Sequence, residues 1–167
     1  RQALLNSGVT AQYNLKSGDN DIRHSIDADA LVIATGHNTT NIQGFSSIPT
    51  ALTRGQVEAI PTQPHLSNLA TVLCHKGYLT PAMQGHHALG STYIKNDVKT
   101  EYRESEQQQN LAMHARSLAD CDWAKNLMVE NQGRAAIRCS TPDHLPLVGA
   151  LPDLEKQQEQ YANYGGK

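Results

Sequence analysis

Residues 71–94, TVLCHKGYLTPAMQGHHALGSTYI, carry the pattern that decides the fold class. Short runs of strand-forming residues fall at 71–75, 78–83 and 87–94. Between them, Lys76-Gly77 and Gln84-Gly85 place glycine where a tight turn joins antiparallel strands. The stretch therefore predicts an antiparallel meander. With helices expected on its flanks, the predicted fold class is α+β.

A helix is expected after this meander. Ser105-Glu106-Gln107-Gln108 matches a capping box, in which a serine and a residue three positions later bond to each other's backbone N–H groups. Leu111, Ala115 and Leu118 follow at spacings i, i+4 and i+7, which puts them on one face of a helix. This is the clearest helix in the sequence.

A different pattern precedes the meander. Residues 28–34, ADALVIA, form a nearly continuous apolar run that ends at Thr35-Gly36-His37. Such a run is typical of a strand buried on both faces of a parallel sheet. Ligands of α/β sheets bind at the carboxyl ends of strands, where glycine lets backbone amides come close. A core strand with an ordinary glycine turn explains the same residues and is favoured on spacing alone.

Composition limits the class of protein. The chain has 167 residues, 38% of them hydrophobic, which allows one domain or pieces of two. Its 14 Lys and Arg against 16 Asp and Glu leave a formal net charge of −2, which argues against a dedicated polyanion-binding domain. The longest strongly apolar run, 30–34, is far short of the ~20 residues that cross a bilayer, so no membrane insertion is expected. Because Arg1 stands where Met would start a chain and no signal segment follows, we expect a piece of a longer polypeptide.

Cysteines and histidines suggest no metal chemistry. The cysteines are Cys74, Cys121 and Cys139. An odd number without C-x-x-C spacing favours neither a disulfide framework nor a zinc ribbon and fits a reducing cytoplasm. The meander would bring His75 opposite His86 and His87, but neighbouring strand residues face opposite sides, so at most one of each adjacent pair could reach a shared ion. We therefore expect no metal site.

Arg138 is the most conspicuous candidate for binding. Strands are expected at 127–130 and 135–139, and Arg138 lies in the second, directly before residues 140–144. A guanidinium on a strand can hold a carboxylate through two parallel hydrogen bonds. Strand alternation could instead direct Arg138 to solvent, or it could pair with Asp143. The sequence leaves these readings open.

Four segments occur in a recognisable order: residues 28–37 (ADALVIATGH), 54–57 (RGQV), 78–81 (YLTP) and 136–149 (AIRCSTPDHLPLVG). Their order and approximate spacing resemble those of the D-amino-acid oxidase and glycine oxidase superfamily of FAD-dependent enzymes. Within it, residues 73–81 (LCHKGYLTP) and 133–138 (GRAAIR) resemble a branch that modifies tRNA.

The resemblance implies a two-part flavoenzyme in which an antiparallel substrate-binding sheet covers the flavin. Residues 1–44 would be part of a Rossmann-like FAD-binding domain, 45–137 the substrate-binding sheet domain with flanking helices, and 138–167 a return segment toward the FAD domain. No dinucleotide-binding glycine motif occurs, so most of the FAD contacts are expected outside this chain. The fragment alone is expected to be inactive.

The resemblance also implies roles for individual residues. Thr35, Gly36 and His37 would lie beside FAD, Arg138 would hold the substrate carboxylate, and Tyr78 would face the substrate pocket. The departures from the pattern of simpler amine oxidases are Cys139 and His144, in the positions usually taken by proline and glycine.

The implied activity is removal of the carboxymethyl group from 5-carboxymethylaminomethyl-(2-thio)uridine at the tRNA wobble position. A methyltransferase half using S-adenosylmethionine would then methylate the product, and tRNA would bind through the full-length protein in the cytoplasm. Candidates for a small basic patch are Lys76, Lys95, Lys99 and Arg103, with solvated surface charge as the alternative. The other functions considered are a free amino-acid oxidase of the glycine or sarcosine type and a non-catalytic binding module.

Overall fold

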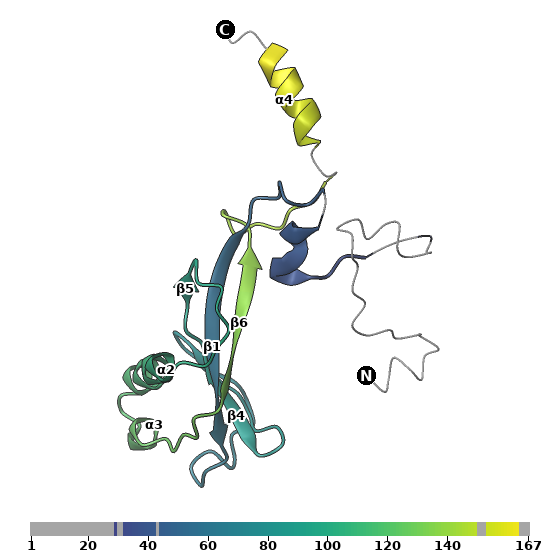
Figure 1. The fold of residues 1–167 in the computed structure, drawn as a ribbon. Coiled ribbons are helices and arrows are strands. Elements are labelled where there is room, and N and C mark those ends of the chain that lie inside the picture. The colour runs from purple at the N-terminus through teal and green to yellow at the C-terminus, as the bar shows by residue number, and fades with distance from the viewer. Residues whose placement is uncertain (1–28, 30–31, 43, 150–152, 164–167) are drawn as a thin grey trace. The chain divides into compact units, whose positions relative to one another are not determined.

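The computed structural model describes residues 29, 32–42, 44–149 and 153–163 (Figure 1). The chain divides into two compact units, one of residues 1–48 with 149–167 and the other of residues 49–148. Assignment of these units to FAD-binding and substrate-binding parts stays a prediction. None of the helices in the described ranges is both long and apolar enough to cross a membrane.

The first unit contains η2, a 3-10 helix at Gly36–Asn41, and α4, Leu154–Asn163. The buried strand expected at 28–34 is not observed in its described residues: positions 32–34 have no regular secondary structure, and Val32 is 88% exposed. A strand of this type needs neighbours on both sides and cover on both faces. No strand in the described part of the chain pairs with it. Residues 28, 30 and 31 lie outside the described residues.

The second unit is built on a six-stranded sheet, with strand order β2-β3-β4-β1-β5 and with β6 also paired to β1. The strands are β1 Ala51–Pro61, β2 Leu73–Cys74, β3 Tyr78–Leu79, β4 His86–Gly90, β5 Ile94–Lys95 and β6 Gly133–Ser140. Every pairing is antiparallel, which confirms the predicted meander and the α+β class. The turn between β3 and β4 has positive φ at Gln84 (54°) and Gly85 (82°), as a tight hairpin requires.

Two strand predictions need correction. The run expected at 87–94 is divided, because β4 ends at Gly90 and β5 begins at Ile94. The two strands pair with different parts of the long β1, residues 57–61 and 53–54. The expected strand at 127–130 is absent from the structure, whereas that at 135–139 lies within β6.

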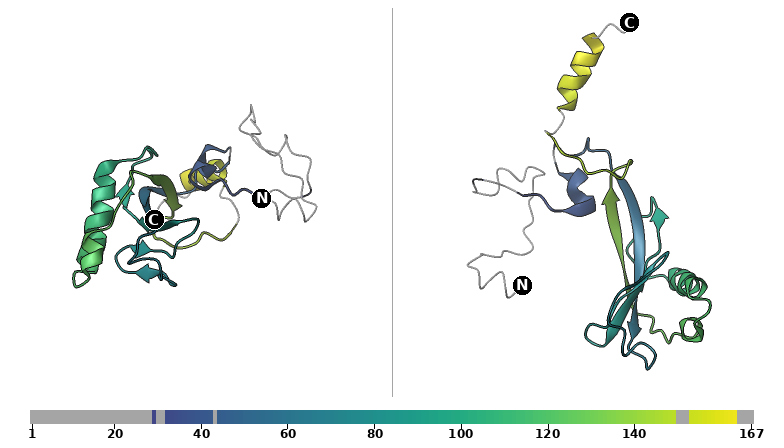
Figure 2. Two further views of the ribbon diagram at one scale, coloured as in Figure 1. Left: turned by 90° about the horizontal axis from the view of Figure 1, so that it is seen from below. Right: turned by 180° about the vertical axis from the view of Figure 1, so that it is seen from behind.

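The helix α2, Glu104–Ser117, packs on one face of β1, with the short α3, Asp122–Lys125, beside it (Figure 2). The predicted capping box is wrong, because Arg103 is the N-cap, no side chain caps the helix, and Ser105 lies within it. Of the predicted apolar face, Leu111 packs against the core, Ala115 is partly buried, and Leu118 is the C-cap. The buried helix residues are polar: Glu106, Gln107, Asn110 and His114.

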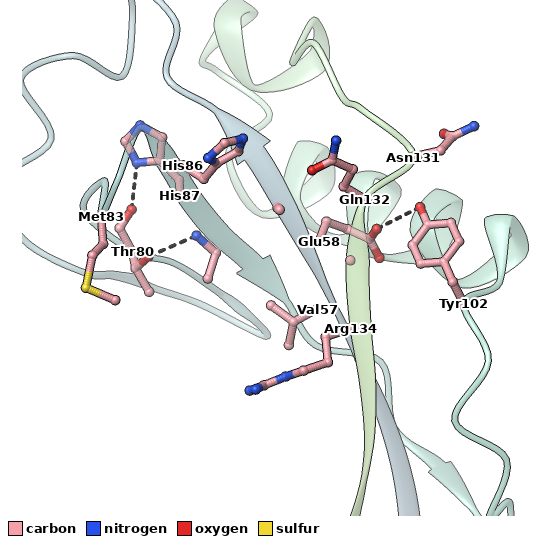
Figure 3. Close-up of a pocket in the computed structure, with 13 residues that line it drawn as sticks. Val57, Glu58, Thr80, Met83, His86, His87, Tyr102, Asn131, Gln132 and Arg134 are labelled. Atoms are coloured by element: carbon pink, nitrogen blue, oxygen red, sulfur yellow. Dashed lines mark hydrogen bonds between the residues drawn. The ribbon is translucent and has the colours of Figure 1, made fainter. Parts of the chain in front are cut away.

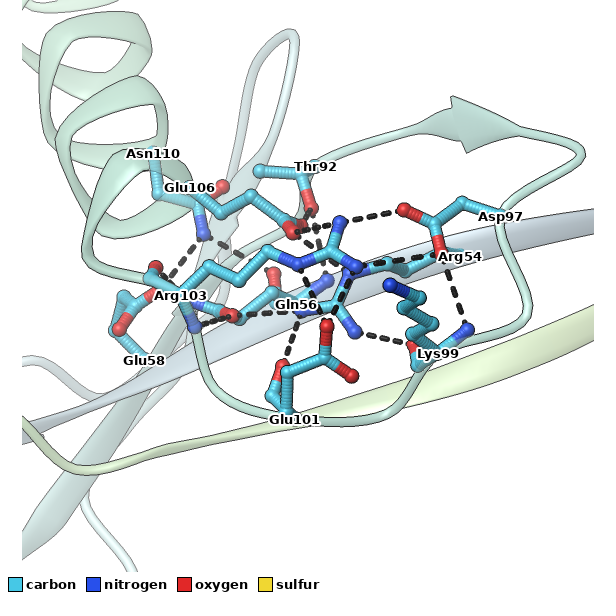
Figure 4. Close-up of polar contacts among 10 residues, drawn as sticks. All are labelled: Arg54, Gln56, Glu58, Thr92, Asp97, Lys99, Glu101, Arg103, Glu106 and Asn110. Atoms are coloured by element: carbon cyan, nitrogen blue, oxygen red, sulfur yellow. Dashed lines mark hydrogen bonds and ion pairs between the residues drawn. The ribbon is translucent and has the colours of Figure 1, made fainter.

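The polar face of α2 is buried because β1 presents polar side chains to it. Arg54 and Glu106 are 0% and 1% exposed, and Arg54 Nε donates to Glu106 Oε1 at 2.6 Å (Figure 4). Arg54 also donates to the carbonyl oxygens of Lys99 and Glu101 and to Gln56 Oε1. The guanidinium is thus fully hydrogen-bonded in the interior, as a buried charge must be.

The network extends along the strand through Gln56 and Glu58. Gln56 Nε2 donates to Glu58 Oε1 at 3.0 Å, and Gln56 Oε1 accepts from the Arg103 backbone N–H at 2.8 Å. Asn110 Nδ2 donates to Glu58 Oε1 and to the Gln56 carbonyl, each at 3.0 Å. These bonds fix the start of α2 and its second turn to β1.

Apolar packing is confined to one end of the sheet. The buried core consists of Ile60, Leu66, Leu79 and Leu89. Partly buried side chains surround it: Leu69, Leu73, Leu111, Trp123, Leu127 and Val129. Because this core is small, the hydrogen bonds of Arg54, Gln56 and Glu58 contribute much of what binds α2 to the sheet.

A pair of histidines joins α2 to the β2–β3 turn. His75 Nδ1 accepts from the Gly77 N–H at 2.9 Å, so the proton of the neutral ring belongs on Nε2, which donates to His114 Nδ1 at 3.0 Å. His114 is 0% exposed, and burial lowers its pKa to about 4, with the neighbouring His75 contributing. The hydrogen-bond partner of His75 is thus a helix residue, His114, which the sequence analysis did not single out.

We predict that Glu106→Ala destabilises the protein by about 3–5 kcal/mol, because Arg54 would stay buried without its counter-charge. Urea unfolding measures the change. The matched control is Asp122→Asn, whose side chain is 96% exposed in its pair with Lys125 and whose loss should leave the midpoint nearly unchanged. If both variants lower the free energy of unfolding by the same small amount, the Arg54–Glu106 pair has no structural role.

We also predict that stability falls as the pH is lowered from 6.5 toward 4. The unfolded chain takes up a proton on His114 in this window, whereas the folded chain, with its lowered pKa, does not. His114→Gln should reduce the difference in thermal midpoint between pH 7 and pH 5, and His65→Gln, at an exposed position, should not. An unaltered difference in the His114 variant would refute this assignment.

Candidate functional site

The face of the sheet opposite α2 is built from small and basic residues. Strand alternation places Arg54, Gln56 and Glu58 toward α2, so the intervening residues of β1 point the other way. No described helix of residues 49–148 packs on that side, which is called the bare face below. Its strand positions follow from the registers: Ala51, Thr53, Gly55, Val57, Ala59, Pro61, Cys74, Tyr78, His86, Ala88, Gly90, Lys95, Arg134, Ala136, Arg138 and Ser140.

The registers bring the predicted residues Tyr78 and Arg138 to this same face. Arg138 is paired with Thr53, whereas Tyr78 is paired with Gly90, which is in turn paired with Val57. Directly paired residues of antiparallel strands point to one side of the sheet. The roles of both residues remain predictions, but their side chains share one face.

Arg138 lies flat over β1. A Cβ atom built on Gly55 would be 2.8 Å from Arg138 Nη2 and 2.9 Å from its Cζ, so only glycine leaves room for the guanidinium. Arg138 Nη2 donates to Ser91 Oγ. The alternative pairing with Asp143 is not observed, because Asp143 Oδ1 accepts from the Leu145 N–H at 3.1 Å and forms no ion pair with Arg138 among the described residues. Most of the five N–H groups of Arg138 therefore remain available to an anion.

Between Tyr78 and Arg138 the bare face carries mostly small residues. Gly90 and Ala136 have no side chain larger than a methyl group, Val57 is paired with Gly90, and the Arg138 guanidinium covers Gly55. Tyr78 is half-buried, and its hydroxyl has no hydrogen-bond partner within the described part of the chain. A planar ring could approach such a surface closely, with polar groups available at both ends. The residues present therefore fit a flavin lying against the sheet.

The candidate cofactor residues belong to the first unit. Thr35 directly precedes η2, and its Oγ1 lies 2.9 Å from Thr39 Oγ1. Gly36 has φ of 57°, a left-handed conformation that favours glycine, and nothing lies within 4 Å of a Cβ built there. His37 follows as a half-exposed residue of the 3-10 helix. Contact of these residues with FAD stays a prediction.

A pocket of about 640 Å³ opens near the start of β6 (Figure 3). Its lining residues are Val57, Glu58, Ala59, Thr80, Met83, His86, His87, Ala88, Tyr102, Asn131, Gln132, Gly133 and Arg134. Tyr102 Oη donates to Glu58 Oε2 at 3.0 Å. Burial, with Glu58, raises the pKa of Tyr102 well above its usual range, so the phenol stays protonated and keeps this bond.

The cysteines, the potential metal ligands and Arg103 form no further site among the described residues. All the cysteines are free thiols, with Cys74 and Cys139 exposed. In the ranges that the structure describes, no group of three His, Cys, Asp or Glu side chains could hold a metal ion. Arg103 of the expected basic patch is held by Asp97 at 2.5 Å and Glu101 at 2.8 Å, and its hydrogen bonds lower the pKa of both carboxyls. It is therefore not a free surface charge.

Sequence reasoning missed Gly55, Ser91 and Arg134. Glycine within a strand signals close approach by another group, and Gly55 carried that signal. Arg134 lies four residues before Arg138, so alternation places both on one face of β6. Ser91 could not be found in this way, because it contacts Arg138 from outside any strand.

The sequence comparison identifies the family of the chain. Residues 3–166 match the family model described as DAO, FAD dependent oxidoreductase. The match covers nearly the whole chain, so the chain belongs to the DAO family of FAD-dependent oxidoreductases.

Two curated relatives share a printed name, tRNA 5-methylaminomethyl-2-thiouridine biosynthesis bifunctional protein MnmC. The one from Pseudoalteromonas atlantica is 52% identical over 169 residues, covering 95% of this chain and 24% of that protein. The one from Shewanella amazonensis is 45% identical over 143 residues, covering 84% and 22%. The chain thus spans about a quarter of the length of these relatives.

Solved structures of glycine oxidases have the same fold. The enzyme from Geobacillus kaustophilus has a TM-score of 0.60 at 20% identity, over 75% of this chain and 34% of that one. The enzyme from Bacillus cereus has a TM-score of 0.55 at 18% identity, over 72% and 33%. At these identities the likeness establishes the fold alone.

We predict that Gly55→Ala lowers the thermal midpoint only slightly, because the new methyl group meets the movable end of Arg138. Gly77→Ala is the matched comparison and should be strongly destabilising, since its Cβ would meet the Gly90 backbone carbonyl and Met113. Thermal unfolding of both variants measures the difference. If Gly55→Ala lowers the thermal midpoint strongly, and the midpoint is not restored when Arg138→Ala is added, a group other than Arg138 occupies this space.

Proposed function

We propose that this chain is part of the FAD-dependent oxidoreductase domain of a bifunctional tRNA-modifying protein. The reaction would remove the carboxymethyl group from 5-carboxymethylaminomethyl-(2-thio)uridine at the tRNA wobble position. The observation that carries the proposal is the common placement of Arg138 and Tyr78 on the bare face, with the guanidinium uncompensated by any described carboxylate. The relatives named for tRNA 5-methylaminomethyl-2-thiouridine biosynthesis supply the substrate class.

Arg138 would recognise the substrate by its carboxylate. The substituent is in effect a glycine attached through its nitrogen to the base, and two parallel N–H···O bonds fix both the position and the angle of its carboxylate. Ser91 holds one Nη of Arg138, which restricts the guanidinium before substrate arrives. Arg138 and Ser91 thereby set where the adjacent methylene lies, and positioning of this kind accounts for much of the rate in such reactions.

Tyr78 would contact the substrate on the side away from Arg138. Its hydroxyl is free among the described residues and lies on the same face, so it can donate to the bound carboxylate or to the base. Together with Arg138 it would hold the methylene in place, and FAD, when bound, would supply the two-electron oxidation there. With water as the co-reactant, the products would be the aminomethyl base and glyoxylate. Thr35, Gly36 and His37 would contribute contacts to FAD, with its remaining contacts outside this chain.

The whole protein would supply the other partners. In the proposal, tRNA binds through the full-length protein in the cytoplasm, and a methyltransferase half methylates the aminomethyl product with S-adenosylmethionine. A free amino-acid oxidase of the glycine or sarcosine type is the second candidate, favoured only by the shared fold of the glycine oxidases. A non-catalytic module finds no support in the family membership.

The test uses the purified full-length protein and tRNA carrying 5-carboxymethylaminomethyluridine. We expect flavin absorbance, conversion of the nucleoside to its aminomethyl form and release of equimolar glyoxylate. Arg138→Ala should raise the apparent KM for this tRNA roughly 10- to 100-fold, because a charge-assisted carboxylate contact is lost. Arg116→Ala, on α2, is the matched control. Oxidation of free glycine or sarcosine with peroxide release, but no change in the tRNA, would favour the second candidate.

A further inference from the structure

We propose that the pocket at the start of β6 is a second binding subsite, which takes a nucleotide of the RNA strand next to the oxidised uridine and holds its phosphate with Arg134. The inference rests on the proposed function, because it assumes an RNA substrate. It goes further in assigning RNA recognition to this sheet rather than to distant parts of the protein.

The pocket lies at the end of the sheet, where Val57, Ala59 and Arg134 line it from the bare face and Glu58, bonded to Tyr102, lines it from the α2 side. Arg134 is paired with Val57, in the row of the sheet that also contains Gly90 and Tyr78. Arg134 and Arg138 are four positions apart in the strand, a distance of ~13 Å along β6. A carboxylate held by Arg138 and a phosphate held by Arg134 would therefore belong to neighbouring parts of one extended ligand. A free amino acid is too short to reach both.

The charges on the bare face suit an RNA strand. Its basic strand residues are Arg134, Arg138 and Lys95, and none of its strand positions carries Asp or Glu. Lys95 and Arg138 are paired with the same residue, Thr53, so they stand in one row. Arg134 is exposed and forms no ion pair or side-chain hydrogen bond within the described residues. Its guanidinium is thus available to a phosphate.

The pocket has the chemistry of a nucleobase site. Val57, Ala59 and Ala88 give it an apolar floor, on which a planar ring can rest. The amide of Gln132 and the imidazole of His86 line it as well, with His86 Nε2 3.9 Å from Glu130 Oε2 (Figure 3). Asn131 and Thr80 also line the pocket, but their side chains are already hydrogen-bonded within the protein. Proteins recognise single-stranded RNA by stacking splayed bases on flat side chains and bonding their polar edges. At about 640 Å³ the pocket is far larger than a glycine unit needs.

The experiment measures binding rather than turnover. The full-length protein is titrated with the anticodon stem-loop carrying 5-carboxymethylaminomethyluridine at several salt concentrations. Arg134→Gln should weaken binding about tenfold and reduce the slope of log K against log salt by about 1, as expected for the loss of one phosphate contact. Arg116→Gln makes the same change of charge on α2, and its affinity and slope should equal those of the wild type.

The outcomes separate this inference from the proposed function. If the wild-type protein binds the stem-loop and Arg134→Gln matches it in affinity and slope, the subsite is refuted, whatever the enzyme oxidises. If Arg134→Gln weakens binding with the reduced slope, the subsite stands, even where no glyoxylate is released and the proposed reaction fails. Binding of free glycine with no binding of the stem-loop would overturn both.

Discussion

The buried ion pair between Arg54 and Glu106 is the interaction on which the arrangement of the second unit depends. An arginine in the middle of a strand must point to one face or the other, and a buried guanidinium is stable only where acceptors surround it. Glu106, Gln56 and two backbone carbonyls provide those acceptors on the α2 side. The charge of Arg54 therefore decides which face of the sheet packs against α2. Strand alternation then leaves the small and basic residues of β1 and β6 on the bare face.

The sheet could be predicted from sequence because its signals are local. Glycines at the turns marked the meander, and the apolar run before residue 140 marked β6. The helix face could not be predicted in the same way, because the periodicity rule assumes that apolar residues are the buried ones. The contrary signal was the alternation of Arg54, Gln56 and Glu58 in β1, matched by Glu106 and Asn110 one turn apart on α2. Recognising it requires knowing that these elements are neighbours.

The candidate site was predictable only in part for a related reason. A resemblance can suggest Arg138 and Tyr78 one at a time, but a shift of one residue in strand register would turn either to the covered face. The observed registers through Gly90, Val57 and Thr53 decide that they share a side. The apolar run at 28–34 has no comparable support, because the neighbours that such a strand needs are not among the described strands.

The formal net charge of −2 is a poor guide to the surface that a ligand meets. Glu58 and Glu106 are 1% exposed and face α2, where Arg54, Gln56 and Asn110 saturate them. Their charges are compensated at short range, so they offset little of the field beyond the sheet. On the opposite side Arg134, Arg138 and Lys95 have no acidic neighbour on any strand position. A chain with a small negative total charge can thus present a cationic face, because no strand position on that face carries an acidic residue.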